Sequence, residues 1–206
     1  MHRRLSSKRV ALLFVGLLGA GCGGEESRLN PTDSSVEASA QALTTSATSQ
    51  GCTFTIAAVA QPGQLPPFYN YVVTRQASVG CPYAAASTTV GSSYTSSAAI
   101  TGNSLGLAIA YTSKNTPSGS SPVSVYVKQI DPSTLSTVRS SMLTCGPSIY
   151  SVSFSDLFMP DLNTVQVDGS KGCKLYGLSE MGSGSSYHAS FNDFFSTTTP
   201  PTVVAY

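Results

Sequence analysis

The feature that most constrains the fold of this 206-residue chain is a recurring alternation of large apolar residues with small or hydroxyl-bearing ones. Residues 105–111 read LGLAIAY, residues 123–127 read VSVYV, and residues 150–155 read YSVSFS. Successive side chains of a strand point to opposite faces, so this pattern predicts half-buried strands. Turn residues such as Asp131-Pro132-Ser133 separate the runs. We therefore expect an all-β fold, an antiparallel β-sandwich.

The scarcity of charge excludes several functional classes. Only 10% of the residues are charged, against about 25% in an average soluble domain, while 41% are hydrophobic. Eleven Lys and Arg residues against ten Asp and Glu residues give no basic surface that would bind phosphates. The composition therefore argues against a nucleic-acid partner. It also argues against a wholly disordered chain, which needs low hydrophobicity and high net charge.

The first 22 residues have the order of segments found in an export signal. Four fixed positive charges within residues 1–9 precede an apolar run over Val10–Leu18, and Gly19-Ala20-Gly21 leads to Cys22. A charged, an apolar and a small-residue segment in this order predict a signal peptide over residues 1–21. An ordinary secretory signal cut near Ala20 is the alternative, and it would leave Cys22 as an unpaired thiol.

With its cysteine at the cleavage point, this segment resembles the signal of the bacterial lipoprotein class, although Gly19 occupies the place where that class usually has Leu. The resemblance covers the signal only. It implies that Cys22 is acylated, that the partner of the N-terminus is a membrane, and that Gly23 directs the protein to the outer membrane, on its periplasmic or cell-surface side. Residues 22–51 then form a lipidated N-terminus and a flexible linker rich in Ser and Thr, because they contain no aromatic residue.

An internal sequence repeat divides residues 52–206, the rest of the chain, into two parts. Cys52 and Cys145 are 93 residues apart, and Cys81 and Cys173 are 92 apart. The tetrapeptide GSSY recurs at residues 91–94 and 184–187. These offsets predict two related units, 52–111 and 145–206, joined by a hairpin segment, 112–144. A small β-propeller-like assembly is the alternative fold, because residues 105–140 have the rhythm of one blade.

The repeat also predicts how the cysteines pair. Four cysteines allow three connectivities, and spacing alone does not choose among them. If each unit is self-contained, the disulfides are Cys52–Cys81 and Cys145–Cys173. Because no CxxC pair is present and His188 is the sole histidine after residue 22, we predict no metal site and no cofactor.

The sequence shows no convincing catalytic constellation. No SxxK motif occurs, and His188 is the only candidate base. Asp131, Asp156 and Asp168 are interpreted as turn residues. Asp156 and Glu180 could form the carboxylate pair of a glycosidase, but nothing in the sequence brings the two side chains within catalytic distance. We predict that the protein is not an enzyme.

The candidate ligand contacts are Phe68, Tyr69, Tyr71 and His188. The first three follow the rigid pair Pro66-Pro67, and exposed tyrosines of this kind stack on sugars or peptides. The competing interpretation is that Tyr69 and Tyr71 fill the core. We predict a non-catalytic binding or display module of the cell envelope with a glycan or protein ligand. A secreted hydrolase using His188, and a lipid-anchored intercellular contact factor or toxin, are the alternatives.

Overall fold

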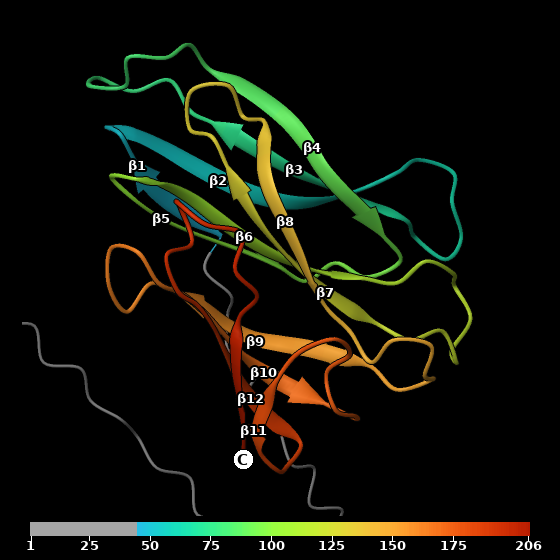
Figure 1. Cartoon of the computed structure of the whole chain (residues 1–206). Helices are drawn as coiled ribbons and strands as arrows, with labels where there is room; N and C mark the ends of the chain where they lie inside the picture. Colours follow the sequence, from blue (N-terminus) through green and yellow to red (C-terminus); the bar gives the residue numbers. More distant parts are fainter. Residues whose placement is uncertain (1–44) are drawn as a thin grey trace, which may run out of the picture. The chain divides into compact units, whose positions relative to one another are not determined.

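The computed structural model describes residues 45–206, and these are all β (Figure 1). Three sheets follow one another along the chain, and neighbouring strands within them are antiparallel except for one parallel pair. The predicted all-β antiparallel fold is therefore confirmed. The predicted signal peptide over 1–21, Cys22 and the linker up to residue 44 lie outside the described residues.

The three sheets are named A, B and C in chain order. Sheet A consists of β1 (Ser46–Ser49), β2 (Cys52–Ala60), β3 (Tyr69–Arg75) and β4 (Ala86–Ser93), in that order. Sheet B consists of β5 (Ala98–Asn103), β6 (Gly106–Ser113), β7 (Ser124–Ile130) and β8 (Thr137–Leu143), also in order. Sheet C has the order β11-β13-β12-β10-β9, with bounds β9 (Val152–Phe158), β10 (Val165–Lys171), β11 (Glu180–Gly182), β12 (Ser186–Phe191) and β13 (Thr202–Ala205).

Sheet B is the middle layer, because its two faces belong to two different cores. Along β6, Leu107, Ile109 and Tyr111 belong to the core shared with sheet A. Ala108 and Ala110, which alternate with them, belong to the core shared with sheet C. The sequence predicts β6 as half-buried, but both of its faces are covered. The alternation here is between large and small residues, and the small ones let sheet C pack closely.

Two sequence segments have different places from those that the sequence predicts. Residues 46–49, placed in the linker by the sequence, form β1, because the left-handed turn at Gln50 and Gly51 folds them back onto β2. The segment 112–144 forms a hairpin, β7–β8, as predicted, but this hairpin extends the sheet begun by β5 and β6. The sheets are stacked as layers that share cores, so the propeller alternative does not describe the fold.

Both predicted disulfides, Cys52–Cys81 and Cys145–Cys173, are present. Cys52, the first residue of β2, is joined to the loop after β3, and Cys145, in the segment before β9, is joined to the loop after β10. The two GSSY segments, however, occupy different places: residues 91–94 lie at the end of β4, whereas 184–187 lie at the start of β12. In the second case the short strand β11 lies between Cys173 and β12.

Asp131 caps the turn between β7 and β8 as expected. Its carboxylate accepts hydrogen bonds from the hydroxyl and N–H of Ser133 and from the N–H of Thr134. These hydrogen bonds, led by the one from the Ser133 hydroxyl, hold the pKa of Asp131 below its ordinary value. The turn also links sheet B to sheet A, because the carbonyls of Pro132 and Ser133 accept hydrogen bonds from Arg75 of sheet A.

No helix within residues 45–206 has the length and apolarity needed to cross a membrane.

Candidate functional site

The predicted aromatic contacts after Pro66-Pro67 separate into a core residue and two partly exposed ones. Tyr71 is fully buried, its ring packs against that of Tyr111 with centroids 4.6 Å apart, and its hydroxyl lies 2.6 Å from the Thr95 carbonyl oxygen. It therefore contributes packing, as the competing interpretation expects, and is not available to a ligand. Phe68 and Tyr69 are half-buried, and Phe68 packs edge-on against Tyr94.

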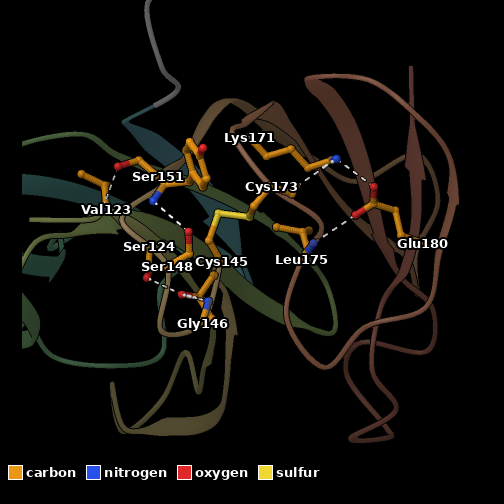
Figure 2. Close-up of a disulfide and its surroundings, with 12 residues drawn as sticks. Val123, Ser124, Cys145, Gly146, Ser148, Ser151, Lys171, Cys173, Leu175 and Glu180 are labelled. Carbon is orange, nitrogen blue, oxygen red and sulfur yellow. Dashed lines mark hydrogen bonds and ion pairs between the residues drawn. A yellow bond between two sulfur atoms is a disulfide. The ribbon is translucent and has the colours of Figure 1, made fainter.

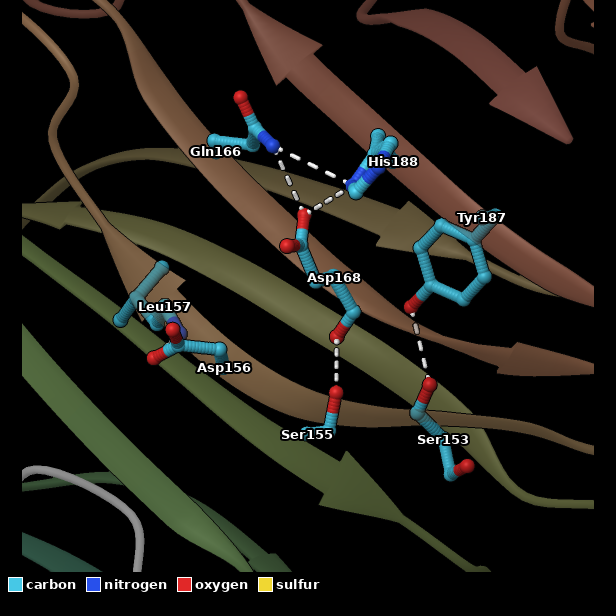
Figure 3. Close-up of polar contacts among 8 residues, drawn as sticks. All are labelled: Ser153, Ser155, Asp156, Leu157, Gln166, Asp168, Tyr187 and His188. Carbon is cyan, nitrogen blue, oxygen red and sulfur yellow. Dashed lines mark hydrogen bonds and ion pairs between the residues drawn. The ribbon is translucent and has the colours of Figure 1, made fainter. Parts of the chain in front are cut away.

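His188 lies on the outer face of sheet C, hydrogen-bonded to Asp168 on the neighbouring strand (Figure 3). Its Nδ1 atom is 2.6 Å from Asp168 Oδ1, and the side chains are 39% and 22% exposed. Gln166 donates a hydrogen bond to the same carboxylate oxygen at 2.9 Å. The Tyr206 ring covers the imidazole at a centroid distance of 4.6 Å. This arrangement fixes the ring and directs Nε2 away from Asp168.

Asp168 is not the turn residue that the sequence predicts. β10 continues through Asp168 to Lys171, and the ladder with β9 has a bulge at Gly169. A side chain at Gly169 would place its Cβ in a steric clash with the carbonyl oxygen of Ser153, so glycine is needed for this close approach and not for a turn. The signal for the partnership was the alternation of residues 165–168, VQVD, which places Asp168 on the face of Gln166.

The chemistry available to this imidazole depends on what surrounds it. Within residues 45–206, no Ser, Thr or Cys side chain is hydrogen-bonded to Nε2 of His188. Ser155, which is nearby in Figure 3, donates instead to the main-chain carbonyl of Asp168. The face therefore has an oriented base without a paired nucleophile.

The carboxylates Asp156 and Glu180 do not meet. They lie on β9 and β11, which are the opposite edges of sheet C with three strands between them. At about 4.8 Å per strand this is a separation of roughly 19 Å, too far for a glycosidase pair. The described residues also contain no cluster of three or more His, Cys, Asp or Glu side chains that could hold a metal ion.

Two cavities, neither predicted from the sequence, lie near the Cys145–Cys173 disulfide: one is lined by Cys173, the other by Thr144 and Gly146, which flank Cys145. Figure 2 shows the disulfide and its surroundings. The larger cavity, of about 480 Å³, is lined by Lys171, Cys173, Lys174 and Glu180, among others. The Lys171 ammonium is 2.8 Å from Glu180 Oε1 and also donates to the carbonyls of Cys173 and Gly184. Its three donors thus have three acceptors, and we interpret the pair as structural.

The smaller cavity, of about 290 Å³, is named here the Tyr126 cavity. Its walls come from the end of β6, the β6–β7 loop, β7, the end of β8 and the segment after it. The polar residues that line it are Ser113, Asn115, Ser121, Ser124 and Thr144, and the apolar ones are Pro122, Tyr126 and Met142, with Gly146 completing the wall. The lining contains no carboxylate, imidazole, amine or thiol.

The Tyr126 cavity exists because sheet A covers only part of sheet B. Tyr111, Tyr126 and Met142 are cross-strand neighbours on β6, β7 and β8. Tyr111 is buried beneath β4, where its hydroxyl lies 3.4 Å from the Val90 carbonyl oxygen. Tyr126 is only half-buried, and Met142 is 45% exposed. Sheet A therefore covers Tyr111 fully, Tyr126 only in part, and Met142 least of the three.

The disulfide fixes one wall of this cavity. In Figure 2 Cys145 lies next to Gly146, whose N–H donates to the Thr144 hydroxyl. The Ser124 hydroxyl is 3.0 Å from the same Thr144 oxygen. Sequence reasoning missed the site because its lining combines residues within 113–126 with residues within 142–146, which the pairing of β6, β7 and β8 brings together.

Comparisons of the chain with protein-family models, with curated proteins and with solved structures found no match.

Proposed function

We propose that the chain is an exported, lipid-anchored protein of the cell envelope whose β domain binds a ligand without transforming it. The observation that carries the binding function is the Tyr126 cavity, which offers an aromatic ring and several hydroxyls but no carboxylate, imidazole or amine. Catalysis by proton transfer most often uses one of these groups, placed within hydrogen-bond reach of the substrate.

The envelope location rests on two further features. Two disulfides are typical of a protein that folds in an oxidising, extracytoplasmic compartment. The lipoprotein-like signal ending at Cys22 supplies the anchor, and the several acyl chains of that class would hold the domain persistently at the outer membrane.

The anchoring half of the proposal is tested by metabolic labelling with radioactive palmitate. The full chain should incorporate the label and sediment with membranes, whereas Cys22→Ser should lose the label and appear in the soluble fraction. A labelled Cys22→Ser variant would overturn the anchor. Protease treatment of whole cells then distinguishes the cell-surface side from the periplasmic side.

A second function, hydrolysis, is favoured by one observation, the Asp168–His188 pair on the outer face of sheet C. The experiment compares the full chain with His188→Ala on a panel of ester and glycoside substrates. We expect no turnover by either protein. Turnover by the native chain that disappears in His188→Ala would replace the binding function with the hydrolase.

A further inference from the structure

The uncharged lining of the Tyr126 cavity restricts the ligand to a neutral one. A charged ligand would lose its hydration on entering and find no opposite charge among the lining residues. Phosphorylated compounds, acidic peptides and basic peptides are therefore disfavoured. At about 290 Å³ the cavity lies at the lower end of the usual range for small-ligand sites, about 300–1,000 Å³. This volume suits a compact molecule or one terminal unit of a chain.

Tyr126 supplies a rigid aromatic surface to that ligand. Its ring stacks on Tyr111 with a centroid distance of 5.4 Å and an interplanar angle of 16°. The ammonium of Lys128, which donates to the Val90 carbonyl, lies 5.7 Å from the Tyr126 centroid. A ring held in place before binding loses little conformational entropy when a ligand packs against it.

Polar groups without intramolecular partners lie around this ring. Within residues 45–206, the side chains of Ser113, Asn115 and Ser121 have no hydrogen bonds to other protein groups, although all three line the cavity. An apolar ligand would leave these groups without hydrogen bonds, at a cost in free energy. The matching ligand has an apolar face for the ring and several neutral hydroxyls at its edge.

We propose that the Tyr126 cavity binds a neutral saccharide, with one pyranose ring stacked on Tyr126 and its hydroxyls hydrogen-bonded to Ser113, Asn115 and Ser121. A pyranose ring combines a face of C–H groups with an equatorial rim of hydroxyls, which is the chemistry that this lining complements. The inference rests on the proposed binding function and names its ligand class.

The test is a titration of the full chain, purified from membranes in a detergent that carries no sugar headgroup. The probes are maltotriose, cellotriose, mannotriose, galactotriose and N,N′-diacetylchitobiose, followed by calorimetry and by saturation-transfer NMR. We expect at least one probe to bind with a dissociation constant of about a millimolar or lower.

The variants separate the ring from the fold. Tyr126→Ala should weaken binding about tenfold, because the stacking surface is lost. Tyr126→Phe keeps the ring and should bind nearly as the native chain does. Asn115→Ala should weaken binding several-fold, whereas the matched control Asn163→Ala, an exposed asparagine outside the cavity, should not. A thermal melt of each variant identifies any loss that comes from unfolding.

The outcomes distinguish the ligand class from the binding function. If no saccharide binds, but a neutral peptide on an array binds in a Tyr126-dependent manner, the saccharide is overturned and the binding function stands. Saccharide binding that Tyr126→Ala and Asn115→Ala leave unchanged would overturn this site. If neither saccharide nor peptide binds, both proposals are overturned.

Discussion

Three of the six basic residues in the β domain are buried, one in each sheet. Arg75, Arg139 and Lys171 are 5%, 7% and 7% exposed. A buried cation is costly unless its donors are hydrogen-bonded. Arg75 donates to carbonyls of the β7–β8 turn, Lys171 to those of Cys173 and Gly184, and Arg139 to those of the segment between β12 and β13. These three cations therefore link parts of the domain through hydrogen bonds in its interior.

Arg139→Lys should destabilise the protein by about 1–3 kcal/mol, because an ammonium lacks the planar fork of a guanidinium. The guanidinium donates to the carbonyls of Phe194, Thr197 and Thr199 and lies over the Phe194 ring, 4.7 Å from its centroid. Urea unfolding measures the effect. The exposed control Lys174→Met should change the free energy of unfolding by less than about 0.5 kcal/mol. Equal stability of Arg139→Lys and the native chain would contradict this role.

The ion pair between Glu180 and Lys171 should make the stability of the protein depend on pH. Burial alone would raise the pKa of Glu180, but the hydrogen bonds from Lys171 and from the Leu175 N–H outweigh burial and lower it below its ordinary 4.5. The unfolded chain thus binds the proton more readily than the folded one. The stabilising contribution of Glu180 is complete above about pH 5.5 and is lost as the pH falls through 4.5 to the lower folded value.

Glu180→Gln should cost about 3 kcal/mol at pH 7, since it leaves the Lys171 ammonium buried without a counter-charge. The difference in unfolding free energy between the native chain and Glu180→Gln should shrink as the pH is lowered from 7 to 3. Other carboxylates titrate in both proteins and cancel in this comparison. A difference that stays constant over that range would show that the ion pair does not contribute.

At the scale of the elements, alternation and turn chemistry predict most strands but not their partners. The runs at 123–127 and 150–155 became β7 and the start of β9, and the repeat predicted both disulfides. The middle position of β6 was not predictable, because Ala108 and Ala110 resemble the exposed side of a half-buried strand. Nor was the Asp168–His188 pair, which depends on the register between β10 and β12. The Tyr126 cavity depends on where sheet A ends, which is a property of packing.

The disulfide Cys145–Cys173 is expected to stabilise the β9–β10 hairpin mainly by restricting the unfolded chain. Its sequence separation is 28 residues, which corresponds to about 3–4 kcal/mol in the chain-entropy model. Replacing both cysteines with alanine should lower the free energy of unfolding by that amount, measured in urea. The Cys52–Cys81 pair, separated by 29 residues, is a matched control with nearly the same expected loss. If neither double variant loses stability, restriction of the unfolded chain is not how these bonds act.

At the scale of the whole molecule, sheet B couples the other two sheets. The core toward sheet A and the core toward sheet C are built on alternate residues of the same strands of sheet B. Loss of either core therefore removes the packing from one face of sheet B. Two independent halves would unfold separately, whereas a shared middle layer makes each half depend on the other. The internal repeat in the sequence therefore does not imply two separate folding units.

We accordingly expect a single unfolding transition, with the same midpoint by far-UV circular dichroism and by tyrosine fluorescence. Leu107 and Leu143 test this, because both are fully buried leucines of sheet B but belong to different cores, one toward sheet A and one toward sheet C. Leu107→Ala and Leu143→Ala should each cost about 2–5 kcal/mol. Each should also shift the whole transition, not half of it, because losing one core removes support from the layer on which the other is built. A second transition in either variant would mean that sheet B does not couple its neighbours, and that the chain unfolds as two units.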